Sequence, residues 1–258
     1  MGRSMGVARK VFAISACIWL ANGTAGADFV GLNIGSGQWA PASYTSFNNS
    51  DPDSFDVVDD LDLENPEQSS MVLILEHPIT ALPNFKYQGY NLDSSDYSNF
   101  PSDLRLNGEP LNSGDGITSS IDLTQDDFVL YYQLPSSSRM NLDLGVDLKS
   151  FDGEISLDGT DSTRVSVNET IPQLYLSARY DLSNSGFYVG AHINSNIIDL
   201  GLSESSAQDS TIMLGYDSGN GLGIEGGFKY FSLVLDNVDQ PDADLEYDGI
   251  YLNGYFNF

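Results

Sequence analysis

The sequence contains very few cysteine, histidine and basic residues. Cys17 is the only cysteine, so the chain beyond it offers no disulfide framework, thiolate nucleophile or cysteine metal site. Only two of the 258 residues are histidine, and ten Lys and Arg stand against 37 Asp and Glu, a formal net charge of −27. Because a phosphate backbone requires basic contacts, this charge excludes a nucleic-acid-binding protein.

The sequence also lacks an apolar run long enough for a transmembrane helix, which needs about 20 residues. The best candidate, VFAISACIWLA, follows a basic start and precedes the small-x-small cleavage pattern AGA at 25–27. We therefore predict a cleaved secretory signal peptide at residues 1–27 and a mature domain at residues 28–258. A lipoprotein signal ending at Cys17 is the alternative.

Apolar and polar residues alternate repeatedly along the mature chain. Leu142, Leu144, Val146 and Leu148, for example, alternate with polar residues or glycine. This period of two is typical of strands with one apolar and one polar face. The predicted strands are 28–40, 70–79, 84–92, 121–134, 140–150, 170–181, 186–196, 209–217, 222–236 and 246–258. Most have the 9–11 residues that a tilted strand needs to cross a bilayer.

Short and long connections alternate between these predicted strands. The short ones are rich in Pro, Gly, Ser and Asn, and the long ones are residues 41–69, 93–120, 151–169, 197–208 and 237–245. Short periplasmic turns, long acidic outer loops and an even strand number are typical of outer-membrane barrels. We predict an all-β, transmembrane, antiparallel up-and-down β-barrel in the bacterial outer membrane, in contact with its lipid. Ten strands are expected, with eight or twelve as the alternatives.

The final ten residues, GIYLNGYFNF, form the last predicted strand. Apolar or small residues at 250, 252, 254, 256 and 258 share one face, and Phe258 ends the chain. This ending resembles the C-terminal signal of bacterial outer-membrane barrels. The resemblance implies that the barrel assembly machinery binds this strand through Phe256 and Phe258.

The whole mature chain resembles the small bacterial outer-membrane β-barrel superfamily. Within it, the chain is similar to a little-characterised family named for a Gly-Gly pair. The residues that carry this resemblance are DFVGL at 28–32, Trp39, the pair Gly226-Gly227 and Phe258. The resemblance implies a fold and an outer-membrane location, and it carries over no activity or catalytic residue. By itself, the glycine pair predicts a bend or space for a neighbouring ring such as Tyr255.

A polar network is predicted inside the barrel. Its members are Asp143, Arg179, His192, Glu225 and Lys229. Charges in a narrow lumen must pair or stay hydrated, and a barrel of about eight strands is filled by its own side chains. We therefore expect a plugged, monomeric barrel with a structural or surface-interaction role. The alternative is a narrow channel for small solutes that prefers cations because of its acidic mouth.

No catalytic, cofactor or metal site is predicted. His77 lies at a predicted periplasmic turn, and the second residue after His192 is asparagine, so no hydroxyl stands at the spacing that a His-x-Ser pair requires. An outer-membrane hydrolase is the weaker alternative. The loop 41–68 holds eight acidic residues and no Lys or Arg, but Ser54 and Phe55 break the EF-hand pattern. Only weak, non-specific association of Ca²⁺ or Mg²⁺ is therefore expected.

Overall fold

The computed structural model describes most of the chain beyond residue 30. The described residues are 31–48, 55–56, 68–99, 104–106, 109–111, 116–159, 162–183, 185–196, 205–235 and 242–258. The predicted signal peptide lies outside them, as does most of the acidic segment 49–67. Every secondary-structure element within these ranges is a β-strand. Among these residues there is no helix long and apolar enough to span a membrane.

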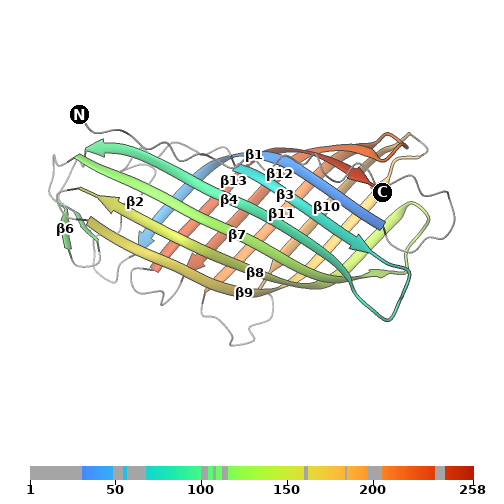
Figure 1. Cartoon of the computed structure of the whole chain (residues 1–258), viewed down its shortest axis with the longest axis horizontal. Helices are drawn as coiled ribbons and strands as arrows, with labels where there is room; N and C mark the ends of the chain where they lie inside the picture. The colour runs from blue at the N-terminus through green and yellow to red at the C-terminus, as the bar shows by residue number, and fades with distance from the viewer. Residues whose placement is uncertain are drawn as a thin grey trace.

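Ten long strands make up the body of the molecule (Figure 1). They are β1 (Gly31–Asn48), β3 (Gln68–Glu76), β4 (Asn84–Asn99), β7 (Gly116–Leu134), β8 (Met140–Asp158), β9 (Ser162–Asp181), β10 (Phe187–Ser195), β11 (Ser206–Asp217), β12 (Leu222–Leu235) and β13 (Asp242–Asn257). The short strand β2 (Phe55–Asp56) adds to β1, and β5 (Leu104–Leu106) pairs with β6 (Glu109–Leu111).

These ten strands form one closed antiparallel barrel. Each pairs with the next long strand along the chain, and β13 closes the barrel by pairing with β1 from Asn33↔Asn257 to Asn48↔Asp242. The order is therefore up-and-down, with no crossover. The predicted ten-strand barrel is confirmed.

The ten predicted segments correspond to the ten long strands, but several strands are longer than predicted. β4 continues to Asn99, β8 continues to Asp158 and β9 already begins at Ser162. The predicted outer loop 151–169 is thus mostly strand, which corrects that assignment. In the extensions of β8 and β9 the alternation continues with reversed polarity, because apolar residues such as Phe151 and Val167 face inward and polar residues such as Asp152 face outward. The sequence of these extensions therefore has the composition of a polar loop. The extension of β4 (residues 93–99) is polar on both faces apart from the exposed Tyr97.

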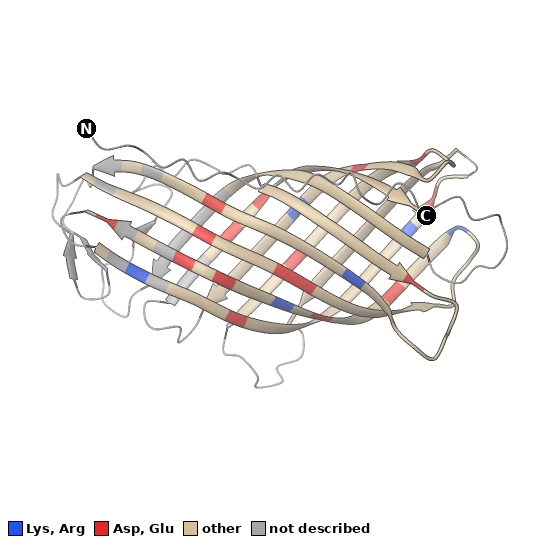
Figure 2. Ribbon diagram, in the orientation of Figure 1, with Lys and Arg blue, Asp and Glu red and all other residues tan. Residues whose placement is uncertain are grey.

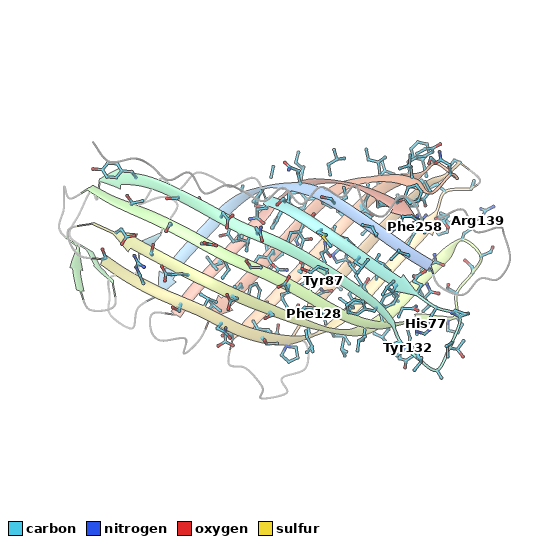
Figure 3. All side chains as sticks on the ribbon, viewed as in Figure 1. His77, Tyr87, Phe128, Tyr132, Arg139 and Phe258 are labelled. Atoms are coloured by element: carbon cyan, nitrogen blue, oxygen red, sulfur yellow. The ribbon has the colours of Figure 1, made fainter. Side chains whose placement is uncertain are left out.

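The two ends of the barrel differ in their connections. The described turns 77–83, 135–139 and 218–221 lie at one end, where Figure 3 also places His77, Arg139 and Phe258. We call the half of the barrel next to these turns the turn half, and the other half the loop half.

The turn half is apolar on its outer surface. This apolar belt consists of Met71, Phe128, Leu130, Tyr132, Leu134, Leu144, Val146, Leu148, Leu176, Tyr180, Phe187, Val189, Ile212, Leu214, Tyr216, Leu222, Ile224, Phe228, Ile250, Leu252 and Phe258, all solvent-exposed. β3 and β10 have nine residues each, which at a rise of about 3.3 Å and a tilt of about 40° span about 23 Å. That height is close to the ~25 Å apolar band of outer-membrane barrels.

The loop half reverses this polarity. Its outer surface carries Asp93, Asp122, Asp126, Asp152, Glu154, Asp158, Arg164, Glu246 and Asp248, and Figure 2 shows how its acidic residues are spread over several strands. Its interior is packed with buried apolar side chains. We call these ten residues the apolar plug: Leu92, Ile121, Leu123, Phe151, Val167, Ile171, Phe231, Leu233, Leu235 and Leu245. A half with a dry core and a polar surface is built like a soluble β-barrel.

Two glycines in the turn half allow tyrosines to lie across the barrel wall. A Cβ on Gly215 would come within 2.1 Å of the Tyr188 ring, and one on Gly223 within 2.1 Å of the Tyr255 ring. The predicted space for Tyr255 is therefore beside Gly223 and not beside Gly226-Gly227. A Cβ on Gly227 would instead meet the backbone oxygen of Ile212 at 1.9 Å, so this glycine serves close strand packing.

Candidate functional site

A cavity of about 490 Å³ occupies the lumen of the turn half. Its lining begins at the strand ends with Asn33, Gln133 and Phe258, and it reaches Trp39 and Lys229 midway along the barrel. Since these first residues lie beside the short turns, the cavity opens at the turn end. Its size is within the range of small-molecule sites.

All five residues of the predicted lumen network line this cavity, but they do not form one network. The Arg179 guanidinium bonds to Asp181 at 3.0 Å and to Asp217, both near the turns. Lys229 and His192 instead contact Asp209, which lies deeper in the barrel. Among the described residues, the side chains that donate hydrogen bonds to Glu225 are the hydroxyls of Tyr188 and Tyr251. One carboxylate oxygen of Asp143 has no hydrogen-bond partner among these residues.

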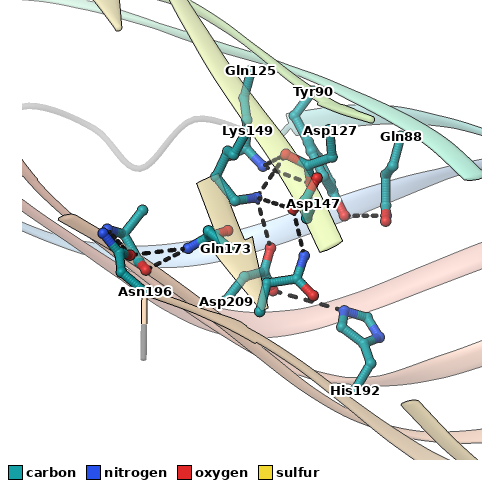
Figure 4. Close-up of polar contacts among 12 residues, drawn as sticks. Gln88, Tyr90, Gln125, Asp127, Asp147, Lys149, Gln173, His192, Asn196 and Asp209 are labelled. Atoms are coloured by element: carbon teal, nitrogen blue, oxygen red, sulfur yellow. Dashed lines mark hydrogen bonds and ion pairs between the residues drawn. The ribbon is translucent and has the colours of Figure 1, made fainter. Parts of the chain in front are cut away.

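A buried charged cluster closes the inner end of the cavity (Figure 4). Its members are Asp127, Asp147, Lys149, His192, Asp209 and Lys229, of which Figure 4 labels all but Lys229. The Lys149 Nζ lies 2.7 Å from Asp127, 3.7 Å from Asp209 and 4.0 Å from Asp147. Neutral donors assist, since Asn194 donates to Asp147 at 2.8 Å and Gln125 donates to Asp127 at 3.0 Å, although one oxygen each of Asp147 and Asp209 accepts no hydrogen bond from the described residues. Charges without access to water are tolerated only when paired and hydrogen-bonded in this way.

Asp209 is the centre of this cluster. It lies 3.0 Å from Lys229 and 3.8 Å from the His192 Nε2, in addition to Lys149. The sequence interpretation missed Asp127, Lys149 and Asp209 as network members. The alternation within predicted strands 121–134, 140–150 and 209–217 places all three on the inner face, so that signal could have identified them.

The apolar plug lies directly beyond the charged cluster. Phe151 and Phe231 are both fully buried and their rings are 6.0 Å apart, while Lys149 lies 5.9 Å from the Phe231 ring. Leu123 and Leu233 are also fully buried. In the part of the chain that is described, the lumen therefore passes from an open polar cavity through a paired charged layer to a dry core.

Tyrosines and two carboxylates form much of the cavity wall. Tyr188 and Tyr251 donate to Glu225 at 2.8 and 3.0 Å, each from a different strand. Tyr131 donates to Glu76 at 2.9 Å, and Gln133 donates to the same oxygen at 3.0 Å. A third ring joins the first group, because the Tyr255 hydroxyl lies 3.0 Å from that of Tyr188.

The two predicted assembly residues lie at the turn end of β13. The rings of Phe256 and Phe258 meet at a centroid distance of 4.6 Å, and the Phe258 amide donates to Leu32 on β1 at 2.9 Å. Half of the Phe258 surface is exposed. The last strand therefore both closes the barrel and presents an aromatic pair beside the opening.

His77 has a local structural role in the turn between β3 and β4. Its ring contacts the Pro83 carbonyl at 3.0 Å and accepts from the Ile79 amide at 3.2 Å. The described residues contain no group of three or more His, Cys, Asp or Glu placed to hold a metal ion. The expected weak association of Ca²⁺ or Mg²⁺ concerns the acidic loops 41–68 and 237–245, most of whose acidic residues lie outside the described residues, and stays a prediction.

Comparison with known proteins gave only distant structural similarities. No family model matches the sequence, and no curated protein matches it either. The outer membrane protease OmpT from Escherichia coli is 11% identical with a TM-score of 0.48, over 90% of this chain and 97% of that one. An outer membrane channel from Pseudomonas putida F1 is 10% identical with a TM-score of 0.38, over 91% and 97% of the two chains. The attachment protein Ail of Yersinia pestis is 10% identical with a TM-score of 0.34, over 90% and 100%.

Proposed function

We propose that this chain is a monomeric outer-membrane barrel that does not conduct solutes and that presents a rigid acidic extension on the bacterial surface. The reversal of polarity along the barrel carries this proposal. The turn half has the exposed apolar belt that contact with lipid requires, and the loop half has the polar exterior and apolar interior of a water-exposed domain. The turns then face the periplasm, and the loop half protrudes outside the cell.

The apolar plug supports a closed lumen. A solute crossing the barrel would have to separate Lys149 from its carboxylates and then pass between Phe151 and Phe231, which are fully buried. Envelope structure or surface interaction is therefore the role that the geometry favours. The acidic exterior of the loop half would meet other molecules first, and opposite charge would steer basic partners toward it.

A narrow, cation-preferring channel is the second candidate. The observation in its favour is the cavity, which is open at the turn end and extends to the middle of the barrel. Such a channel would need the plug to rearrange.

The outer-membrane location brings two further proposals. We propose that residues 1–27 are removed during export, and that the barrel assembly machinery binds the last strand through Phe256 and Phe258. The exposed aromatic pair at the end of β13 supports the second of these.

We also propose that the chain is not a hydrolase. The His192 ring faces Asp209 at 3.8 Å, and the Thr211 hydroxyl opposite it makes no hydrogen bond to any described residue. A general base needs its nucleophile within hydrogen-bond reach. Hydrolysis that disappears in H192Q, with the barrel still folded, would contradict this proposal.

Single-channel recording of the refolded protein in a planar bilayer tests the closed lumen. The wild type is expected to insert with a silent baseline, and the variant F151A/F231A, which shortens two plug side chains, is the positive control for inserted protein. Insertion is scored independently by the shift in gel migration on boiling. Reproducible, cation-selective steps from the wild type would overturn the closed barrel and establish the channel.

A further inference from the structure

Two carboxylates in the cavity wall have no cation beside them. Glu225 is held by the hydroxyls of Tyr188 and Tyr251, and Glu76 by Tyr131 and Gln133. Neither forms an ion pair with any described residue. Neutral donors leave the charge of both carboxylates uncompensated in a confined space, which is costly unless a cation or water shares it.

The cations that line the same cavity do not offset these charges. Arg179 is taken up by Asp181 and Asp217, and Lys229 by Asp209 at 3.0 Å. Lys86 lies 5.5 Å from the centre of the Tyr175 ring, and no ion pair of its amino group occurs within the described ranges. Since Asp143 also lines the cavity, three carboxylates outside ion pairs stand against one ammonium group, and the wall has an excess of negative charge.

Two buried polar groups at the inner end of the cavity also lack partners. Trp39 and Thr211 both line the cavity and are 2% and 4% exposed, and neither the indole nitrogen of Trp39 nor the hydroxyl of Thr211 makes a hydrogen bond to the described residues. Buried polar groups in folded proteins nearly always have a partner. A ligand with hydroxyl groups would give the indole N–H an acceptor and the threonine hydroxyl a donor or acceptor.

The aromatic wall suits a cation as well. The Arg179 guanidinium already lies 3.6 Å from the Tyr188 ring centre, and the Lys229 amino group lies 3.6 Å from that of Tyr90. Aromatic faces beside carboxylates attract ammonium groups through the ring quadrupole. Tyr251, which holds Glu225 on its other side, extends the same wall.

We infer that the cavity is a binding site for a small polyhydroxylated amine of the size of an amino sugar, which enters from the turn end. Its ammonium group lies at Glu225, and its hydroxyl groups face Thr211 and Trp39. This site goes beyond the proposed function, because a closed barrel can hold a ligand from the periplasmic side whether or not it conducts.

Trp39 provides a direct readout of binding. The other tryptophan, Trp19, lies within residues 1–27, so the protein without this segment has Trp39 as its single tryptophan. We would refold this protein in detergent and titrate it with glucosamine at slightly acidic pH, where the amine is protonated. Glucose, which replaces the amine with a hydroxyl, is the matched neutral probe. A saturable change in fluorescence with glucosamine, and a much weaker response to glucose, is expected.

The variant Glu225→Gln tests where the amine binds. It keeps an oxygen that can accept from Tyr188 and Tyr251 but removes the charge, so the affinity for glucosamine should fall by about ten-fold or more. Glu246→Gln changes an exposed glutamate on the outer surface of the loop half and should leave the affinity unchanged. Where E225Q does not fold, Glu76→Gln is the second variant. It removes the other carboxylate outside an ion pair from the cavity wall and so reduces the negative charge that attracts the amine. The affinity should again fall, but by less than in E225Q, because the ammonium group lies at Glu225.

Several results would overturn the inference. They are a flat titration with glucosamine, equal binding of glucose, an unchanged affinity in the folded E225Q or E76Q protein, and an equal loss in E246Q. None of them depends on the conductance of the barrel, so failure of this site and failure of the closed-lumen proposal are distinguishable.

Discussion

Replacing Lys149 with methionine should strongly destabilise the barrel. The Lys149 side chain is fully buried, and its ammonium group lies 2.7 Å from Asp127, 3.7 Å from Asp209 and 4.0 Å from Asp147. Methionine keeps most of the volume of the side chain but removes the charge. Asp209 would retain Lys229, and Asp147 would retain the amide of Asn194 at 2.8 Å. Asp127 would lose its closest cation and, among the described residues, would keep the amide of Gln125 at 3.0 Å as its side-chain donor. Leaving a buried charge without its partner costs about 3–5 kcal/mol, and we expect a loss in this range.

The loss comes mainly from Asp127, whose carboxylate is nearest to Lys149, so removing the charge of Asp127 should recover stability. In K149M/D127N the asparagine oxygen can still accept from Gln125, and the double variant should regain at least half of the free energy lost by K149M. Arg164→Met is the matched surface control, since its exposed guanidinium lies 3.5 Å from Glu154 and 3.6 Å from Asp158. Such a solvated ion pair contributes about 0–1 kcal/mol.

The assay is urea unfolding of the refolded protein in detergent or lipid vesicles, followed through the fluorescence of Trp39. The midpoint and slope give the free energy of unfolding. If K149M unfolds within about 1 kcal/mol of the wild type, or if R164M loses as much as K149M, the buried pairing of Lys149 does not stabilise the barrel.

Two further predictions concern the barrel wall and its last strand. Gly223→Val should destabilise the barrel by about 1–3 kcal/mol in the same unfolding assay, because its Cβ would come within 2.1 Å of the Tyr255 ring. Gly254→Val, which meets nothing within 4 Å, should be close to neutral, and equal losses would refute the tyrosine-over-glycine packing. Phe258→Ala should lower the amount of folded barrel in outer-membrane fractions of cells while the purified chain still refolds in detergent. Normal levels in cells would count against an assembly role for Phe258.

Much of the architecture was predictable because it follows from local alternation. The segment 140–150 is a strand with Leu142 and Leu144 outward whatever the rest of the chain does, since lipid requires an unbroken apolar face there. The short turns interrupt this pattern clearly. The alternation along the predicted strand 222–236 also places Glu225 and Lys229 on its inner face, and both residues line the lumen.

The extension of the barrel was not predictable in the same way. Residues 151–169 alternate too, but apolar members such as Phe151 and Val167 face inward, while the acidic residues Asp152, Glu154 and Asp158 face outward. Considered without the neighbouring strands, the sequence pattern of residues 151–169 cannot be distinguished from that of an acidic loop with scattered apolar residues. Only closure of the barrel, which brings Phe151 on β8 within 6.0 Å of Phe231 on β12, turns those residues into a core.

By itself, the sequence determined the ten strands and the face on which each of their residues lies, whereas the signal peptide at residues 1–27 and the absence of nucleic-acid binding stay predictions. The tertiary structure alone decided which inward residues meet. Lys149 reaches Asp209 from β8 to β11, and Tyr188 reaches Glu225 from β10 to β12, across strands that are not neighbours in the sheet. Such contacts depend on the register of every intervening strand pair and on the curvature of the closed wall. Alternation within one strand contains no information about either.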